Sequence, residues 1–113
     1  PLPVSGAFHS PWMSAAATEF AAVLETVPFA DAAIPVLSNT DPTPSCDAAV
    51  LKQRLRQQMT TGVRWRETME AMQVASIDTM VEIGPGNVLS GLAKRSMPGV
   101  TLSSLAGAAD LGL

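Results

Sequence analysis

The chain has 113 residues, of which 47% are hydrophobic and only 15% charged, and its formal net charge is −3. An average domain has about 25% charged residues, so this composition indicates surfaces that other protein covers. The negative net charge argues against nucleic acid as a partner. The sequence contains neither an apolar run long enough to span a bilayer nor a signal-peptide layout, and Cys46 is its only cysteine. We therefore expect no membrane association and no internal disulfide, and a cytoplasmic, reducing location.

Two different spacings of apolar residues predict strands that alternate with helices. The predicted strands cover residues 2–7, 34–39, 79–83 and 100–105. The predicted helices cover about 11–27, 47–59, 64–73 and 88–95. Residues 40–45, which include two prolines, are predicted to form a loop, and the Ala/Gly-rich segment 106–113 a flexible tail. This order indicates an α/β fold with a short parallel sheet flanked by helices.

Caps and apolar stripes define the helices more closely. Ser10 can cap the first helix with Pro11 at its first position, and Asp47 or Ser45 can cap the second. One stripe of the first helix is predicted to be buried, and it consists of Met13, Ala16, Phe20, Val23, Leu24 and Val27. In the last helix, Val88, Leu89 and Leu92 are predicted to point inward.

His9 is the only histidine, and it lies between an apolar segment and a helix start. Imidazole is the side chain whose unperturbed pKa best suits proton transfer near neutral pH. A strand-to-helix turn is also where α/β proteins tend to place reactive groups. The alternative is a capped turn whose histidine only packs or forms hydrogen bonds.

Three segments resemble motifs of malonyl-CoA:acyl-carrier-protein transacylases and of the acyltransferase domains of polyketide and fatty acid synthases. The first is Gly-Ala-Phe-His-Ser-Pro-Trp-Met at 6–13, the second is Gln-Met-Thr-Thr-Gly-Val-Arg-Trp at 58–65, and the third is Glu-Ile-Gly-Pro-Gly-Asn-Val-Leu-Ser-Gly-Leu at 82–92. They occur in the family's order, and the resemblance extends over residues 1 to about 105.

The resemblance implies that residues 1–105 are the C-terminal part of the large subdomain of an α/β-hydrolase-like acyltransferase. The chain contains no Gly-His-Ser-x-Gly elbow, which in this family carries the nucleophilic serine upstream of the histidine motif. The family's carboxylate-binding arginine and its ferredoxin-like subdomain also lie upstream. We therefore expect the chain to be part of a larger enzyme, with the missing N-terminal part as its first partner.

The same resemblance assigns roles to three residues. His9 would be the catalytic base of a serine–histidine ping-pong mechanism. Gln58 would orient His9 through its backbone carbonyl, although glycine stands at position 62 where the family usually has proline. Phe8 would bind substrate, because a phenylalanine before the histidine goes with malonyl and a smaller serine with methylmalonyl. A ring beside the base leaves no room for an α-methyl group.

Other chemical candidates have simpler explanations. Cys46 could be a nucleophile, but it has an adjacent carboxylate and no nearby base, so a packing role is favoured. Gly84-Pro85-Gly86 could hold phosphate, but it lacks the lysine and spacing of a P-loop, so a tight strand-to-helix turn is favoured. Glu82 has no paired carboxylate, so a buried or turn-bonding carboxylate is favoured over a general acid.

Cationic side chains are concentrated in the second and third predicted helices. This basic cluster consists of Lys52, Arg54, Arg56, Arg64 and Arg66. A solvated helix face explains such a cluster, and a docking surface for an acidic carrier protein or for coenzyme A phosphates is the alternative.

Together, these observations predict an acyl-carrier-protein S-malonyltransferase of fatty acid biosynthesis. It would transfer malonyl from coenzyme A to the phosphopantetheine thiol of acyl carrier protein, without a bound cofactor or metal. An acyltransferase domain of a modular polyketide synthase and a non-catalytic α/β interaction module are the alternatives.

Overall fold

The computed structural model describes residues 6–112. The predicted strand at 2–7 therefore lies mostly outside the described residues. The contacts divide the chain after Thr68 into two units, and α3 (Trp65–Val74) contains the boundary between them.

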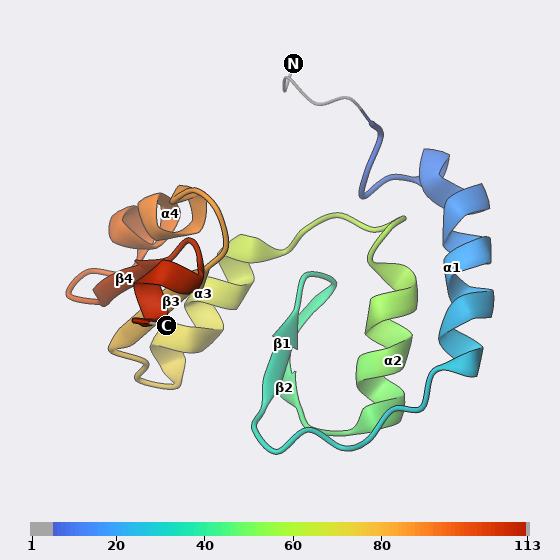
Figure 1. Cartoon of the computed structure of the whole chain (residues 1–113), viewed down its shortest axis with the longest axis horizontal. Helices are drawn as coiled ribbons and strands as arrows, with labels where there is room; N and C mark the ends of the chain where they lie inside the picture. Colours follow the sequence, from blue (N-terminus) through green and yellow to red (C-terminus); the bar gives the residue numbers. More distant parts are fainter. Residues whose placement is uncertain (1–5, 113) are drawn as a thin grey trace. The chain divides into compact units, whose positions relative to one another are not determined.

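In the first unit, the central element is the helix α2 (Ala48–Gln57). It contacts the helix α1 (Ser14–Thr26), and it also contacts an antiparallel hairpin formed by β1 (Val36–Ser38) and β2 (Asp41–Ser45). Figure 1 shows α2 between the hairpin and α1. A 3-10 turn, η1 (Pro11–Met13), leads into α1.

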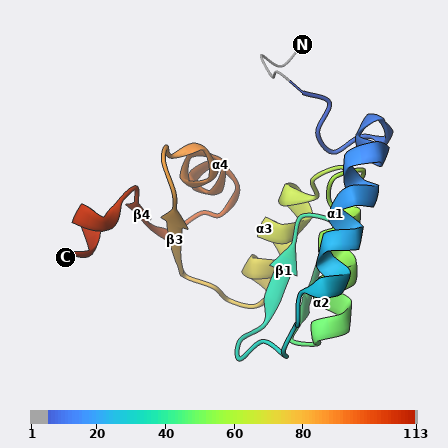
Figure 2. The ribbon, with the colours of Figure 1, turned by 45° about the vertical axis from the view of Figure 1, so that its right-hand side comes forward.

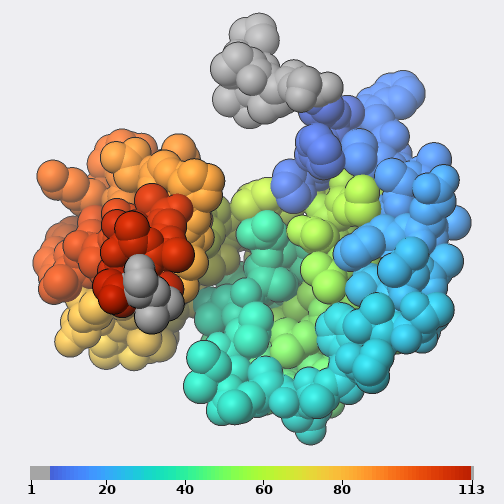
Figure 3. Space-filling view, in the orientation of Figure 1, coloured from blue at the N-terminus to red at the C-terminus, as the bar shows by residue number. Residues whose placement is uncertain are grey.

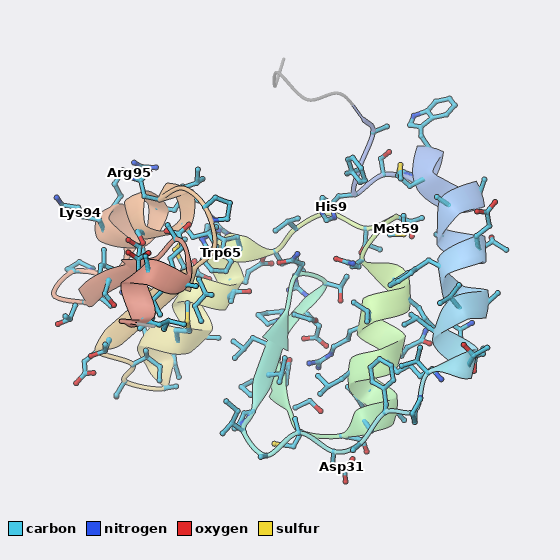
Figure 4. The ribbon with its side chains drawn as sticks, in the orientation of Figure 1. His9, Asp31, Met59, Trp65, Lys94 and Arg95 are labelled. Carbon is cyan, nitrogen blue, oxygen red and sulfur yellow. The ribbon has the colours of Figure 1, made fainter. Side chains whose placement is uncertain are left out.

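Two carboxylates hold the N-terminus of α2. Asp47 is the N-cap and accepts a hydrogen bond from the Val50 N–H at 2.8 Å, as predicted from the sequence. Asp31, which is labelled in Figure 4, adds a second acceptor, because its Oδ1 lies 2.9 Å from the backbone nitrogen of Ala48. Side-chain oxygens at this end satisfy N–H groups that have no partner inside the helix.

The strand β2 was not predicted, because Pro42 and Pro44 argue for a loop. Proline cannot donate to a sheet, but it is tolerated where its nitrogen faces an outer edge. In the described residues, the hairpin has two strands, so one edge of β2 is an outer edge. Because Pro42 and Pro44 are two residues apart, their nitrogens point to the same edge of the strand. The prediction of a loop at 40–45 is therefore wrong.

In the second unit, β3 (Thr79–Ile83) and β4 (Thr101–Leu105) form a parallel pair in register from Thr79–Thr101 to Ile83–Leu105. The helix α4 (Val88–Ser96) connects them and contacts both strands, and Figure 2 shows it beside β3. This arrangement confirms the predicted α/β class with a short parallel sheet. The segment after β4 contains a 3-10 turn, η2 (Ala108–Leu111), and the proposed domain limits 1–105 and 106–113 stay predictions.

The predicted buried stripes are only partly correct. Among the described residues, the buried apolar side chains are Leu24, Met69, Ala93 and Met97. Val23 is 58% exposed and Val88 is 70% exposed, although both were predicted to point inward. Periodicity identifies the apolar face of a helix, but burial also needs a neighbouring element, and the described residues place none over these side chains.

Candidate active site

His9 occupies an unusual backbone conformation at the turn before η1. Its φ is 61°, in the left-handed region that few non-glycine residues adopt and where histidine is enriched. From this turn, its ring reaches the C-terminal end of α2, and Nδ1 lies 2.8 Å from the backbone carbonyl oxygen of Gln58. Figure 4 shows His9 beside the end of α2, where Met59 is labelled. The structure thus brings together two segments 49 residues apart in the sequence.

The end of a helix provides the carbonyl that His9 uses. The last carbonyl groups of an α-helix have no partner within the helix. The Gln57 carbonyl accepts the Thr60 N–H at 3.1 Å and the Thr61 hydroxyl at 2.9 Å. The next carbonyl, that of Gln58, accepts from His9.

This hydrogen bond determines the tautomer of the imidazole. A carbonyl oxygen can only accept, so Nδ1 must carry the proton. In the neutral ring, Nε2 then has the free lone pair and can accept a proton from another group. The geometry is therefore suited to a general base, with Nε2 as the reactive atom.

Phe8 precedes His9, and its side chain is 62% exposed. A Cβ atom placed on Gly6 would lie 2.8 Å from the Phe8 ring, closer than real Cβ atoms approach a neighbour. Gly6 therefore permits the ring to fold against the chain just before the histidine. The role of Phe8 in substrate binding stays a prediction.

Ser10 was predicted to cap the first helix, and this prediction is wrong. No side-chain cap bond is formed at this N-terminus, and the Ser10 hydroxyl instead donates to the Ala7 carbonyl at 2.6 Å. Since this bond spans Phe8 and His9, it stabilises the turn that carries the imidazole. Pro11 does occupy the first helical turn, as predicted.

The turn after β3 is closed by Glu82. Its carboxylate accepts the N–H groups of Leu89 at 3.0 Å and Ser90 at 2.8 Å, at the start of α4. The pKa of Glu82 lies below its ordinary value of 4.5, because the side chain of Ser90, its N–H and the N–H of Leu89 stabilise the carboxylate. This confirms the prediction of a turn-bonding carboxylate. Gly84 and Gly86, with φ of 133° and 94°, provide the tight turn itself.

Most of the basic cluster is paired with carboxylates of the same chain. Lys52 and Arg56 lie 3.5 and 2.6 Å from Glu25, Arg54 lies 2.8 Å from Asp41, and Arg64 lies 3.0 Å from Glu67. These pairs reduce the positive charge that could attract an acidic partner. For Lys52, Arg56 and Arg64, they favour the solvated-face interpretation over the docking alternative. Arg54 is buried and fits neither interpretation.

The remaining candidates show no further site in the described part of the chain. Cys46 is free and exposed. Residues 6–112 contain no group of three or more His, Cys, Asp or Glu side chains arranged to hold a metal ion. Within the same residues, none of the helices combines the length and the apolar character needed to cross a membrane.

No protein-family model matches the sequence. Among curated proteins, the chain is 47% identical over 111 residues to the malonyl CoA-acyl carrier protein transacylase of Synechocystis sp., covering 98% of this chain and 38% of that protein. It is 40% identical over 95 residues to the enzyme of the same name from Bacillus subtilis, covering 84% of this chain and 30% of that protein. The chain thus spans about a third of the length of these relatives.

Solved structures give the same result. The crystal structure of the Synechocystis transacylase matches with a TM-score of 0.90 at 46% identity, over 99% of this chain and 38% of that one. A malonyl-transacylase solved in complex with a type II polyketide synthase acyl-carrier protein matches with a TM-score of 0.86 at 35% identity, over 98% of this chain and 36% of that one.

The α/β fold and a histidine whose tautomer is set by a helix-terminal carbonyl define a candidate proton-transfer site. The chain belongs to the malonyl-CoA:acyl-carrier-protein transacylase family and corresponds to its C-terminal portion.

Proposed function

We propose that this chain provides the general base of an acyl-carrier-protein S-malonyltransferase. The enzyme would move malonyl from coenzyme A to the phosphopantetheine thiol of an acyl carrier protein, in the cytoplasm and for fatty acid synthesis. The hydrogen bond of 2.8 Å between His9 Nδ1 and the Gln58 carbonyl carries this proposal, because it leaves Nε2 free to accept a proton. The likeness to transacylases over nearly the whole chain supports the acyl group and both thiols.

In the first half-reaction, Nε2 of His9 would take the proton of the nucleophilic serine that the family carries upstream. The serine oxygen would bond to the malonyl carbonyl carbon, and the bond from that carbon to sulfur would break. The protonated imidazole would then give its proton to the departing thiolate of coenzyme A. In the second half-reaction, Nε2 would take the proton of the phosphopantetheine thiol, whose sulfur would displace the serine oxygen. His9 would finally return the proton to that oxygen.

A carrier protein of polyketide synthesis is the second candidate acceptor. The structural neighbour solved with a type II polyketide synthase carrier protein favours it. The chemistry at His9 would be the same, and the acceptors can be compared directly by offering both carrier proteins to the enzyme. The remaining alternative, a non-catalytic module, does not explain why the imidazole is half-buried and held in one tautomer.

Replacing His9 tests the proposal. In the full-length protein, His9→Ala should lower malonyl transfer by roughly 10² to 10⁴-fold, which is the usual contribution of a general base. The measurement is transfer of radiolabelled malonyl from coenzyme A to carrier protein. Cys46→Ser is the matched control, because Cys46 is an exposed thiol in a loop and should leave transfer unchanged.

Near-normal transfer by a folded His9→Ala protein would remove His9 from the mechanism. Loss of transfer in Cys46→Ser would instead support the thiol as the nucleophile. Circular dichroism of each variant separates both outcomes from a failure to fold.

A further inference from the structure

Arg54 is a buried cation in the middle of α2, and its side chain is only 10% exposed. Its guanidinium donates through one nitrogen to the Thr43 carbonyl at 2.6 Å and through the other to Asp41 Oδ2 at 2.8 Å. A charged side chain is rarely buried unless it is paired, and removing one partner of such a pair is costly. Arg54 therefore fastens α2 to β2 by two charge-assisted hydrogen bonds.

The other end of this connection is also fixed. Asp41 uses its second carboxylate oxygen, Oδ1, to accept the Thr43 N–H at 2.8 Å. The pKa of Asp41 lies below its ordinary value of 3.8, first because of the Thr43 backbone and side chain and then because of Arg54. Arg54, Asp41 and Thr43 thus form a closed ring of hydrogen bonds, which we call the Arg54 clamp. Figure 3 shows the hairpin (turquoise) lying directly against α2 (green).

The Arg54 clamp lies one helical turn before the carbonyl that holds His9. Arg54 and Gln58 are four residues apart, so they share one face of the helix, and both line a cavity of about 370 Å³ together with Asn39. After Gln58, the N–H of Arg64 donates to the Asn39 carbonyl at 2.8 Å. The segment from Arg54 to Arg64, which contains Gln58, is therefore attached to the β1–β2 hairpin at both ends.

His9 depends strongly on the position of this turn. Its left-handed backbone is strained for a non-glycine residue and persists only where the surroundings hold it. The long-range hydrogen bond of its side chain is the one to Gln58. An N–H···O hydrogen bond needs a donor–acceptor distance of about 2.7–3.2 Å and weakens steeply when its angle falls below about 120°, so a displacement of the α2 terminus would weaken the bond to Nδ1.

We propose that Arg54 and Asp41 are positioning residues for the general base: the Arg54 clamp holds the last turn of α2 against the β1–β2 hairpin and keeps the Gln58 carbonyl on His9 Nδ1. The inference rests on the proposed function of His9 and goes beyond it. It assigns a role in the reaction to a basic side chain whose hydrogen bonds go to Thr43 and Asp41 and not to the imidazole.

The test uses the full-length protein and three variants of the clamp. Arg54→Met keeps the length of the side chain and removes its charge, Arg54→Lys keeps the charge and removes the fork, and Asp41→Asn removes the acceptor charge. Arg56→Met is the matched control, because Arg56 is on the same helix and makes an exposed ion pair with Glu25. Exposed pairs of that kind contribute little to stability.

Two measurements separate positioning from stability alone. The first is the pair of kinetic constants kcat and KM for malonyl-CoA, with kcat calculated per acylatable enzyme. A displacement of about 1 Å can cost 10²-fold in rate, so Arg54→Met should lower kcat about tenfold or more. KM should stay within about twofold, because the clamp binds no substrate. The second is the NMR signal of the His9 Nδ1 proton, assigned by its absence in His9→Ala.

We expect this proton signal to be lost or broadened in Arg54→Met and Asp41→Asn, partly kept in Arg54→Lys, and unchanged in Arg56→Met. Clamp variants with a wild-type Nδ1 proton signal and wild-type kcat would overturn the inference. So would variants whose activity falls only in proportion to the folded fraction. If Arg54→Met does not fold, Arg54→Lys and Asp41→Asn decide the question by the same criteria. A wild-type enzyme that transfers no malonyl contradicts the proposed function, whereas the NMR comparison still tests the clamp.

Discussion

At the residue scale, we predict that Phe8 selects the acyl group. It is adjacent to His9, and Gly6 lets its ring fold against the chain. In the full-length enzyme, Phe8→Ser should raise methylmalonyl transfer relative to malonyl, because one methyl group in a pocket is worth about 1–3 kcal/mol of discrimination. Competition between the two thioesters measures the ratio.

Trp12 provides the control for Phe8. It is another aromatic residue near His9, and its side chain is 85% exposed. Trp12→Ser should leave the ratio of the two products unchanged. An unchanged ratio in Phe8→Ser would mean that Phe8 does not line the acyl pocket.

His9 and Gln58 could be selected from the sequence, but for different reasons. His9 is the only imidazole and lies at a helix start, so elementary chemistry singles it out. Gln58 was selected by resemblance alone, because its relevant atom is a backbone oxygen that any residue has. Arg54 could be identified only as one of several cations. Its burial depends on Asp41, a partner 13 residues away in a strand that the prolines concealed.

At the element scale, the connection from β3 to α4 depends on the ionised carboxylate of Glu82. Since its pKa lies below the ordinary 4.5, the folded state binds fewer protons there than the unfolded state. This contribution to stability is present above the unfolded pKa and is lost as pH falls through the folded one. Glu82→Gln should therefore lower the Tm of the full-length protein near neutral pH, and the difference from wild type should shrink below about pH 4.

Glu19→Gln is the control for this pH dependence. Glu19 is exposed on α1, and its side chain forms no hydrogen bond or ion pair with another described residue. Its replacement should give a Tm profile parallel to that of the wild type. A constant Tm difference between Glu82→Gln and wild type across the acid range would contradict the proposed role of the ionised carboxylate.

The elements also show which local signals are reliable. β3 was predicted at its observed limits, because the run Thr-Met-Val-Glu-Ile ends at a Gly-Pro-Gly turn. β2 was missed, because the rule against proline in strands does not consider which edge the nitrogen faces. The Ser10 cap failed for a different reason, since the hydroxyl donates to the Ala7 carbonyl and its oxygen accepts no N–H of the following turn.

At the scale of the whole molecule, apolar surface is abundant and the buried core is small. Ile34, Ile83 and Val88 are 73%, 81% and 70% exposed. Among residues 6–112, only Leu24, Met69, Ala93 and Met97 are buried apolar residues. A core of this size stabilises a chain only weakly, and exposed apolar side chains favour association with other protein. The chain spans 38% of the length of its Synechocystis relative, and the rest of that relative has no counterpart in these 113 residues.

This leads to a prediction for the 113 residues on their own. They contain a base but no Gly-His-Ser-x-Gly elbow, so alone they should transfer no malonyl above the rate of spontaneous hydrolysis. They should also unfold at low denaturant concentration, since their apolar faces lack neighbours. Mixing them with a separately produced N-terminal portion of the same enzyme should raise both the unfolding midpoint and malonyl transfer. A mixture made with the His9→Ala chain is the control, and it should recover stability without recovering transfer. Robust transfer by the 113 residues alone would require a nucleophile within them and would overturn the proposed division of labour between the two portions.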